Sequence, residues 1–308
     1  MHQPVLVNSM IDLMAIKVGG TYIDGTAGGG GHCAAILEKA GVSARLLAVD
    51  RDADAITRVR ARFADSGFNV VLVHGNFADL AALAAQHDFQ QVDGVLLDLG
   101  VSSFQLDEAG RGFSFRHDGP LDMRMDRSQA ESAATLVQQL DAAELADLIW
   151  RLGEEPAARR IAAAIVRARA SAPLQTTGAL AEVVSAAKGG RRGGRIDPAT
   201  QTFQALRMAV NGELDAVHSG VEAALQLVKP GGRVAVMSFH SLEDRAVKHA
   251  LAAHVGRMVS LPQGGERWEG SVPVCRWITR KPVMADEAEC AANPRARSAK
   301  LRVVERAA

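Results

Sequence analysis

The sequence has few aromatic residues, few cysteines and no excess of either charge. Aromatic side chains make up only 4% of the 308 residues, which excludes a nucleic-acid site built on many stacked bases. The three cysteines, Cys33, Cys275 and Cys290, are an odd number and lack the paired spacing of a zinc site. They indicate a reducing compartment, with neither a disulfide framework nor a bound metal. Because 35 basic residues balance 35 acidic ones, a polyanion would have to be bound by local clusters of charge.

Long apolar runs are also missing. No stretch approaches the roughly 20 apolar residues that a membrane-spanning helix needs, and residues 1–5 do not begin a secretory signal. We therefore expect a cytoplasmic protein without membrane contact, and the oligomeric state stays open. What is present is ordinary for a globular protein, with 48% apolar and 23% charged residues. The length exceeds the usual domain of about 100–150 residues, so we expect a principal domain with an insert or a second domain.

Short apolar runs alternate with helical patterns in the first hundred residues, which is typical of a parallel sheet with crossover helices. A helix around Ile56, Val59 and Phe63 is predicted because these residues recur at spacings of three and four. A further helix is predicted at residues 31–40. The predicted strands are residues 21–24, 45–50, 70–74 and 92–98.

The pattern changes after Gly100. Residues 105–127 form a loop rich in glycine, aspartate and arginine, and the stretch that follows is helical with no sign of a strand. Asp141 and Glu144 have the spacing of a helix capping box. Residues 105–205 are therefore predicted to form an all-helical insert.

Sheet-like patterns return after the insert. A long amphipathic helix from Leu214 to Val228 is followed by the helix stop at residues 229–232. The last three predicted strands are residues 233–239, 274–279 and 300–304. We predict an α/β fold whose sheet domain consists of residues 1–104 and 206–308.

Glycines and acids follow the predicted strands, where an open parallel sheet binds its ligands. The turn from Asp24 to His32 contains five glycines, which let the backbone approach a ligand, and the next helix presents unpaired N–H groups. Asp50 lies about 20 residues further on, at the end of the second strand, where a carboxylate accepts hydrogen bonds from a ribose diol. These features predict an adenosine cofactor, and they fit NAD as well as S-adenosylmethionine.

Further acids favour the sulfonium cofactor. Asp24 would repel a pyrophosphate but suits a cationic amino group or sulfonium, and Asp98 at the end of the fourth strand adds a second acid. Asn76 or Phe77 is a candidate contact for adenine, although Phe77 equally fits the core. His32 is a candidate for ligand contact or for a structural role.

Several polar residues have two interpretations at this stage. Residues 238–245 place polar groups on the substrate side, and Ser241 within them is either a helix cap or a substrate contact. Two basic clusters are either phosphate contacts or solvated loops. The first comprises Lys188, Arg191, Arg192 and Arg195, and the second comprises Arg295, Arg297, Lys300 and Arg302.

Six runs of the sequence carry a family resemblance. They are residues 22–32, 96–103, 111–115, 119–126, 238–245 and 293–298. Together they resemble the bacterial 16S ribosomal RNA cytosine-N4 methyltransferases, the MraW family, over essentially the whole chain. The runs at 119–126 and 238–245 are far more specific than the glycine turn.

The resemblance implies a class I Rossmann-like methyltransferase fold interrupted by a helical insert, with S-adenosylmethionine as cofactor. It implies methylation of the exocyclic N4 of a cytidine in the decoding centre of 16S ribosomal RNA, within the small ribosomal subunit. The insert is then the natural contact for flanking RNA, because the target base must be unstacked. The cofactor contacts implied by the matching motifs are Gly30, Gly31, His32, Asp50, Phe77, Asp98 and Gln105.

Asp98 is also the candidate catalytic residue. It is either a cofactor ligand, which the resemblance favours, or an acceptor for the protons of the attacking amine. Two other classes stay open. An NAD-dependent dehydrogenase would share the fold and Asp50 but needs a cleaner glycine fingerprint, and a non-catalytic RNA-binding protein would not need the acids at the strand ends.

Overall fold

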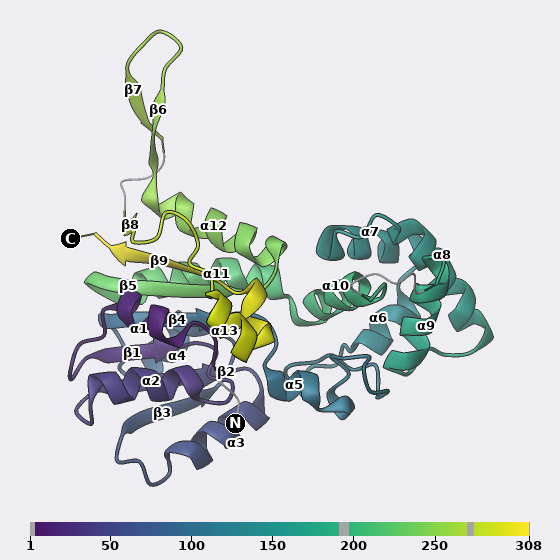
Figure 1. Ribbon diagram of the computed structural model, residues 1–308, viewed down its shortest axis with the longest axis horizontal. Helices are drawn as coiled ribbons and strands as arrows, with labels where there is room; N and C mark the ends of the chain where they lie inside the picture. Colours follow the sequence, from purple (N-terminus) through teal and green to yellow (C-terminus); the bar gives the residue numbers. More distant parts are fainter. Residues whose placement is uncertain (1–3, 191–196, 270–273, 308) are drawn as a thin grey trace. The chain divides into compact units, whose positions relative to one another are not determined.

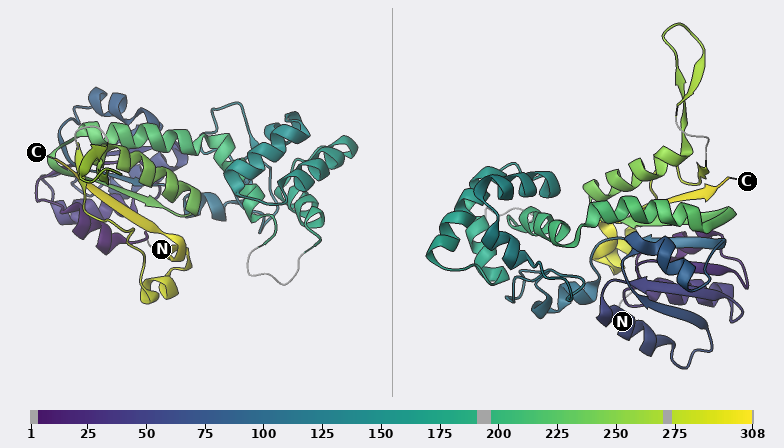
Figure 2. Two further views of the ribbon diagram at one scale, coloured as in Figure 1. Left: turned by 90° about the horizontal axis from the view of Figure 1, so that it is seen from above. Right: turned by 180° about the vertical axis from the view of Figure 1, so that it is seen from behind.

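The computed structural model describes residues 4–190, 197–269 and 274–307, and the chain divides into two compact units. The sheet unit comprises Met1–Gly100 and Leu214–Ala308, and the insert unit comprises Val101–Glu213. Both units are drawn in Figure 1, and Figure 2 gives two further views. The predicted limits of the insert, residues 105 and 205, fall inside helices α5 (Ser103–Asp107) and α10 (Thr200–Asn211). They are too narrow because whole helices belong to one core or the other.

The sheet unit contains a seven-stranded sheet of order β3-β2-β1-β4-β5-β9-β8. The first five strands in this order are parallel, whereas β9 runs antiparallel to β5 and β8 antiparallel to β9. The α/β fold is thus confirmed, and the predictions for β1, β2 and β4 are correct to the residue. The strands are β1 (Thr21–Asp24), β2 (Arg45–Asp50), β3 (Asn69–His74), β4 (Val92–Asp98), β5 (Val228–Ser238), β8 (Cys275–Trp277) and β9 (Lys300–Arg306).

Alternate residues of the central strands enter two different apolar clusters, because side chains of a strand point to opposite faces. Ile23 and Leu97 belong to one cluster, and Tyr22 and Leu96 to the other. Helices cover both faces of the sheet (Figures 1 and 2). The helices of this unit are α1 (Val7–Met14), α2 (Gly31–Ala40), α3 (Ala53–Phe63), α4 (Leu80–Gln86), α11 (Glu213–Leu227), α12 (Ser241–Val255) and α13 (Glu287–Ala292), with short 3-10 turns η1 (Phe77–Asp79) and η3 (Pro294–Ser298).

Two features of the sheet unit differ from the sequence prediction. Strand β5 begins at Val228, five residues earlier than predicted, and its pairing with β4 shifts register between Val92 and Gly94. Lys229 holds this irregular start against β4, since its Nζ lies 2.7 Å from Asp93 Oδ1. In addition, β6 (Arg257–Ser260) and β7 (Glu266–Glu269) form an unpredicted hairpin that projects from the unit (Figure 1).

The insert unit has its own apolar core. Leu145 and Ile149 of α7, Ile161 of α8 and Leu180 of α9 are completely buried in it. Among the described residues of this unit, the β contact is a single antiparallel bridge between residues 120 and 176. The helices are α5, α6 (Ala133–Gln139), α7 (Ala142–Gly153), α8 (Ala158–Ser171), α9 (Thr177–Ala187) and α10, with a short turn η2 (Ala109–Arg111) after α5.

The predicted capping box of α7 is present. Asp141 Oδ1 accepts the backbone N–H groups of Ala143 and Glu144 at 2.7 and 2.8 Å. In return, Glu144 Oε2 accepts the N–H of Asp141 at 2.8 Å. Among the described residues, no helix combines the length and apolar character that crossing a membrane requires.

Candidate active site

The carboxyl ends of β1, β2 and β4 bring three predicted acids to one edge of the sheet. Asp24 pairs in register with Ala48 of β2 and Leu96 of β4. Asp50 and Asp98 therefore each extend two residues beyond Asp24 at the same edge. This is the edge at which an open parallel sheet binds its ligands.

The glycine turn connects β1 to α2 and contains two residues in the left-handed region. Gly28 has a φ of +54° and Gly30 a φ of +73°, conformations that glycine adopts without cost. A Cβ on Gly30 would lie 3.1 Å from Arg62 Cδ, and one on Gly31 would lie 2.9 Å from Pro4 Cγ. The positive φ and the nearby Arg62 side chain therefore disfavour a side chain at position 30, and Pro4 disfavours one at position 31. A Cβ on Gly28 would meet no atom nearer than 3.9 Å, so the open side of the turn is at Gly28.

Asp50 ties the end of β2 to this turn. Its Oδ2 accepts the Gly28 N–H at 2.7 Å, and its Oδ1 accepts the Asp52 N–H at 2.8 Å. Burial raises the pKa of Asp50 to about 6, although these two hydrogen bonds oppose the rise. Each carboxylate oxygen keeps a second lone pair, so Asp50 can still accept the hydroxyls of a ribose.

His32 and Asp98 form an ion pair in which the imidazole is buried and the carboxylate is partly exposed. His32 Nε2 lies 2.9 Å from the Val5 carbonyl oxygen, and its Nδ1 lies 3.3 Å from Asp98 Oδ2. Burial lowers the pKa of His32, but Asp98 and Asp24 outweigh it and raise the pKa to about 9. The imidazole is therefore protonated at neutral pH and donates from both nitrogens. Its ring nitrogens are engaged within the protein, and the backbone N–H groups in the first turn of α2 have no partner within the helix and can bind a ligand.

The second carboxylate oxygen of Asp98, Oδ1, is in a different environment from Oδ2. Asp98 Oδ1 is buried and has no hydrogen-bond partner among the described residues. The backbone at this position is fixed as well, because the Asp98 N–H donates to Thr26 Oγ1 at 2.6 Å. The structure thus holds one carboxylate oxygen in place and leaves the other as a buried acceptor.

Asp24 does not line the edge as the sequence analysis predicts. Its side chain is only 1% exposed, and burial raises the pKa of its carboxyl group. Oδ1 accepts the Thr26 N–H at 3.0 Å, and Oδ2 accepts the Cys33 thiol at 3.1 Å. The prediction fails because the chain turns sharply at the strand end and folds the carboxylate inward. Asp24 acts on the site through His32, whose pKa it raises.

Phe77 lies in η1, directly after β3, and faces helix α11. A Cβ on Gly220 of α11 would lie 2.3 Å from Phe77 Cδ2, so the ring lies against the helix backbone. The ring is partly buried against the apolar cluster of this face. Asn76 caps η1, since its Oδ1 accepts the Ala78 N–H at 3.1 Å. The contact of Phe77 with adenine stays a prediction, and its packing against α11 is observed.

Gln105 belongs to the insert unit, where it lies in α5. Its Oε1 accepts the Ser102 N–H at 2.9 Å, and its own N–H donates to Ser102 Oγ at 3.3 Å. Its side chain is only 4% exposed. Contact with the cofactor stays a prediction.

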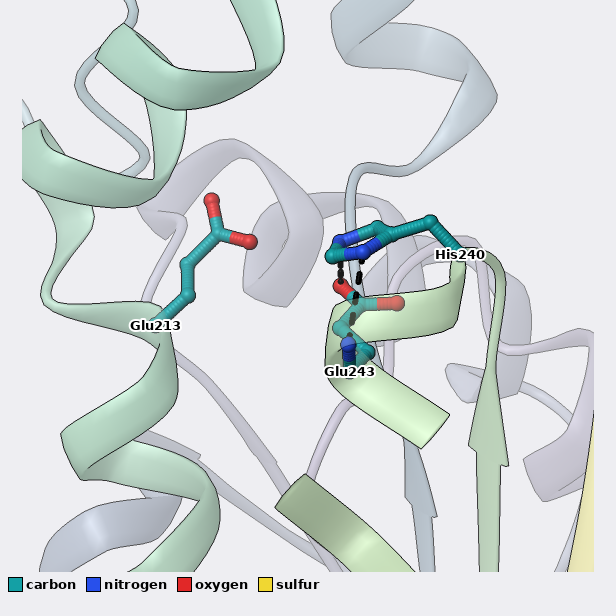
Figure 3. Close-up of side chains that lie close together, drawn as sticks. All are labelled: Glu213, His240 and Glu243. Carbon is teal, nitrogen blue, oxygen red and sulfur yellow. Dashed lines mark hydrogen bonds and ion pairs between the residues drawn. The ribbon is translucent and has the colours of Figure 1, made fainter. Parts of the chain in front are cut away.

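The helix after β5 is capped one residue earlier than predicted. His240 is the N-cap of α12, because its Nδ1 accepts the Glu243 N–H at 3.3 Å, and Ser241 is the first helical residue. Glu243 is buried and its Oε2 accepts the Phe239 N–H at 2.9 Å. Figure 3 shows His240 and Glu243 in contact, with Nε2 and Oε1 3.0 Å apart. A Cβ on Gly100 would lie 3.7 Å from Glu243 Oε1, so this buried acid lies beside the end of β4.

Three contacts at this site are not predicted from the sequence. The Thr26 hydroxyl, the Val5 carbonyl and the Glu243 carboxylate hold the candidate residues in place. The Val5 contact uses a backbone atom 27 residues before its partner, for which no side-chain signal exists. Thr26 and Glu243 lie within the family-like runs, which is the one signal that marks them.

The first basic cluster is only partly described. Lys188 lies 2.5 Å from Glu155 Oε2 and 3.1 Å from the Pro198 carbonyl oxygen, so its charge is paired within the insert unit. Arg191, Arg192 and Arg195 lie outside the described residues.

Glu213 is also drawn in Figure 3. Its Oε2 lies 2.7 Å from Nη2 of Arg207 in α10.

A family model and curated relatives now decide the family. The model of the MraW methylase family matches residues 1–307. The chain belongs to this family. It is 47% identical to Ribosomal RNA small subunit methyltransferase H of Symbiobacterium thermophilum over 306 residues, which covers 98% of this chain and 96% of the relative. It is 48% identical to the protein of the same name from Syntrophobacter fumaroxidans over 308 residues, covering 99% and 96%.

The family makes this MraW-type chain a methyltransferase with S-adenosylmethionine as its cofactor, as the sequence predicts. Among solved structures, the chain has a distant similarity to a SAM-dependent O-methyltransferase of Thermotoga maritima. The TM-score is 0.43 and the identity 10%, with 100% of this chain and 68% of that chain covered.

Proposed function

We propose that the protein transfers the methyl group of S-adenosylmethionine to the exocyclic N4 of a cytidine in the decoding centre of 16S ribosomal RNA. Family membership supports methyl transfer, and the curated relatives are named as methyltransferases of small-subunit ribosomal RNA. The choice of N4 and of the decoding centre rests on the resemblance of the six sequence runs. A ribosomal substrate also implies the cytoplasm as the place of action.

The buried, unpartnered Oδ1 of Asp98 carries the proposal. A buried acceptor without a donor costs free energy, and a ligand that supplies the donor recovers it. Both reactants offer suitable groups, since the cofactor carries an ammonium and cytosine carries an amine. The acids at the strand ends therefore fit a cationic methyl donor and an amine acceptor.

S-adenosylmethionine supplies a methyl group activated by a positively charged sulfur. The protein's contribution is chiefly to position the two reactants, and a near-attack geometry can supply roughly 7–11 kcal/mol. Asp98 is fixed for this task at three points: its N–H by Thr26, its Oδ2 by His32, and its strand by β5. If its Oδ1 accepts a proton of the amine, it helps localise the nitrogen lone pair that attacks the methyl carbon.

We assign cofactor contacts to the residues that the family resemblance selects. Asp50 would bind the ribose hydroxyls, and Asp98 would bind the amino group or face the target amine. The turn contributes backbone N–H groups at the start of α2. The full set remains Gly30, Gly31, His32, Asp50, Phe77, Asp98 and Gln105.

The target cytidine must leave its stack to reach a methyl donor within the site. We assign the neighbouring RNA to the insert unit, whose helices present exposed arginines such as Arg159, Arg160 and Arg167 on α8. Helix α8 contains no acidic residue to oppose a phosphate.

Methyl transfer from labelled cofactor tests the proposal. Small subunits and free 16S RNA, both from a strain lacking this enzyme, serve as substrates, and nucleoside mass spectrometry locates the methyl group. We expect N4-methylcytidine at one position of the small-subunit RNA. Labelling of a base other than cytosine, or of a ribose, would refute the assignment of the acceptor, and no labelling of either substrate would refute the ribosomal substrate.

A further inference from the structure

We propose that Arg297 of η3 binds a phosphate of the ribosomal RNA strand beside the target cytidine. This inference rests on the proposed function and names a contact that the sheet unit itself makes with the RNA backbone. It separates the second basic cluster into residues that stabilise the fold and a residue available to a ligand.

Two members of that cluster are already neutralised. Arg302 is buried and donates to Asp244 through Nε at 2.7 Å and Nη2 at 3.1 Å. Lys300 Nζ lies 3.3 Å from the same carboxylate. Burial acts to raise the pKa of Asp244, but the two cations outweigh it and lower the pKa, so the carboxylate stays ionised between them. Lys300 and Arg302 therefore anchor α12 to β9.

Arg297 is in a different situation. Its side chain is exposed, and no ion pair joins it to any residue that the structure describes. The residues around it are fixed, since Ala296 and Ala299 are fully buried and the Asn293 side chain caps the turn by accepting the Arg295 N–H at 3.2 Å. A buried residue directly before Arg297 and another two positions after it orient Arg297 outward.

The register of β9 puts this turn at the edge where the reactants meet. Lys300, the first residue of β9, pairs with Ser238, the last residue of β5, at the carboxyl edge of the parallel strands. Figure 1 shows α13 and the yellow segment that follows it at the end of the sheet where α12 begins. Glu289 of α13 also accepts the Leu6 N–H at 2.6 Å, next to the Val5 carbonyl that holds His32. The segment that carries Arg297 is thus joined to the candidate active site.

The charges at this edge explain why an exposed arginine there would help to bind RNA. Asp50, Asp98 and Glu243 make the edge acidic, which suits a cationic cofactor but repels the phosphates of an RNA strand. The chain has no net charge with which to attract RNA from a distance. A guanidinium at the rim binds a phosphate with two parallel hydrogen bonds and offsets that repulsion.

Charge variants test the contact. Arg297→Ala and Arg297→Glu are compared with Arg297→Lys and with Lys39→Glu, a charge reversal at an exposed residue in the last turn of α2, away from the carboxyl edge. We expect KM for small subunits to rise about tenfold in Arg297→Ala, more in Arg297→Glu and least in Arg297→Lys. The dependence of binding on salt concentration should become shallower by about one phosphate contact. Lys39→Glu and the affinity of every variant for S-adenosylmethionine should stay unchanged.

Three outcomes would overturn the inference. An unchanged KM and salt slope in Arg297→Glu would show that no phosphate is bound there. A loss of cofactor affinity would make the residue structural. Weaker binding to assembled subunits but not to free 16S RNA would point to a ribosomal protein. Binding of 16S RNA by the wild type and by Arg297→Glu is also measured without turnover. The phosphate contact is therefore tested independently of catalysis. If the wild-type protein methylated neither substrate, that result would contradict the proposed function and not the phosphate contact.

Discussion

His32 connects segments of the sheet unit that are far apart in the sequence. It joins the Val5 carbonyl to Asp98, and both ring nitrogens take part. Its raised pKa means that the folded protein holds this proton more tightly than the unfolded chain does. A residue selected from the sequence as a cofactor contact thus also holds Asp98 Oδ2 in place.

This proton should make stability depend on pH. The pKa of His32 rises from 6.5 to about 9 on folding, so its stabilisation is complete below pH 6.5 and is lost as the pH rises through about 9. The free energy of unfolding of wild type relative to His32→Gln should therefore fall by up to about 3 kcal/mol over this interval. Urea unfolding at a series of pH values measures the difference. A difference that is constant with pH would show that His32 is neutral in the folded protein.

Asp98 allows a second test at the scale of one residue. Asp98→Asn keeps the shape of the side chain but removes the charge that pairs with His32. We expect turnover to fall at least tenfold, because either assigned role needs an anionic acceptor. Calorimetric titration with S-adenosylmethionine separates the roles, since affinity falls if Asp98 binds the cofactor and holds if it faces the amine. Asp65→Asn, at an exposed acid after α3, is the matched control. Full turnover with unchanged affinity would remove both roles.

At the scale of elements, the predictable parts are those with a strong local pattern. The strand β4 is predicted to the residue because its apolar run is bounded by polar residues at both ends. The hairpin β6–β7 is missed because its strands have only four residues each, too few to show a clear alternating pattern. Helix α4 is short and rich in alanine, and alanine marks neither face of a helix.

The start of α12 shows the limit of capping rules. Serine is the expected cap, and Ser241 stands one residue from the observed cap, His240. In the structure His240 Nδ1 accepts the Glu243 N–H, and the buried Glu243 carboxylate in turn accepts the Phe239 N–H. The sequence predicts that Asp50, Asp98 and the glycine turn lie at the carboxyl edge of the sheet, and the structure has them there. The inward fold of Asp24 and the hydroxyl of Thr26 depend on tertiary contacts that no local pattern carries.

The capping box of α7 gives a prediction for one element. Asp141→Ala removes the acceptor of two backbone N–H groups and should destabilise the helix by about 1 kcal/mol. Asp141→Asn keeps an acceptor and serves as the control. Hydrogen exchange of the first-turn amides of α7 should accelerate about fivefold in the alanine variant, while the affinity for S-adenosylmethionine is unchanged. Equal exchange in Asp141→Ala and wild type would show that the box contributes nothing to the helix.

The whole molecule consists of two units with separate apolar cores. Side chains from α6 to α10 make up most of the core of the insert unit, whereas the sheet unit has one cluster on each face of its sheet. The chain passes between the units only where they meet in the sequence, after Gly100 and after Glu213. Separate cores allow one unit to lose stability while the other keeps its structure.

Matched substitutions in the two cores test this independence. Leu145 of α7 and Leu251 of α12 are both completely buried, the first in the core of the insert unit and the second in the sheet unit. Replacing either leucine by alanine should cost about 2–5 kcal/mol by leaving a cavity. In Leu145→Ala, hydrogen exchange should accelerate within residues 101–213 while exchange in the sheet unit stays as in wild type. Leu251→Ala should accelerate exchange in the sheet unit and lower the affinity for S-adenosylmethionine, since the acids that are assigned to the cofactor depend on the sheet. Acceleration across both units in Leu145→Ala would show that they unfold as one cooperative body.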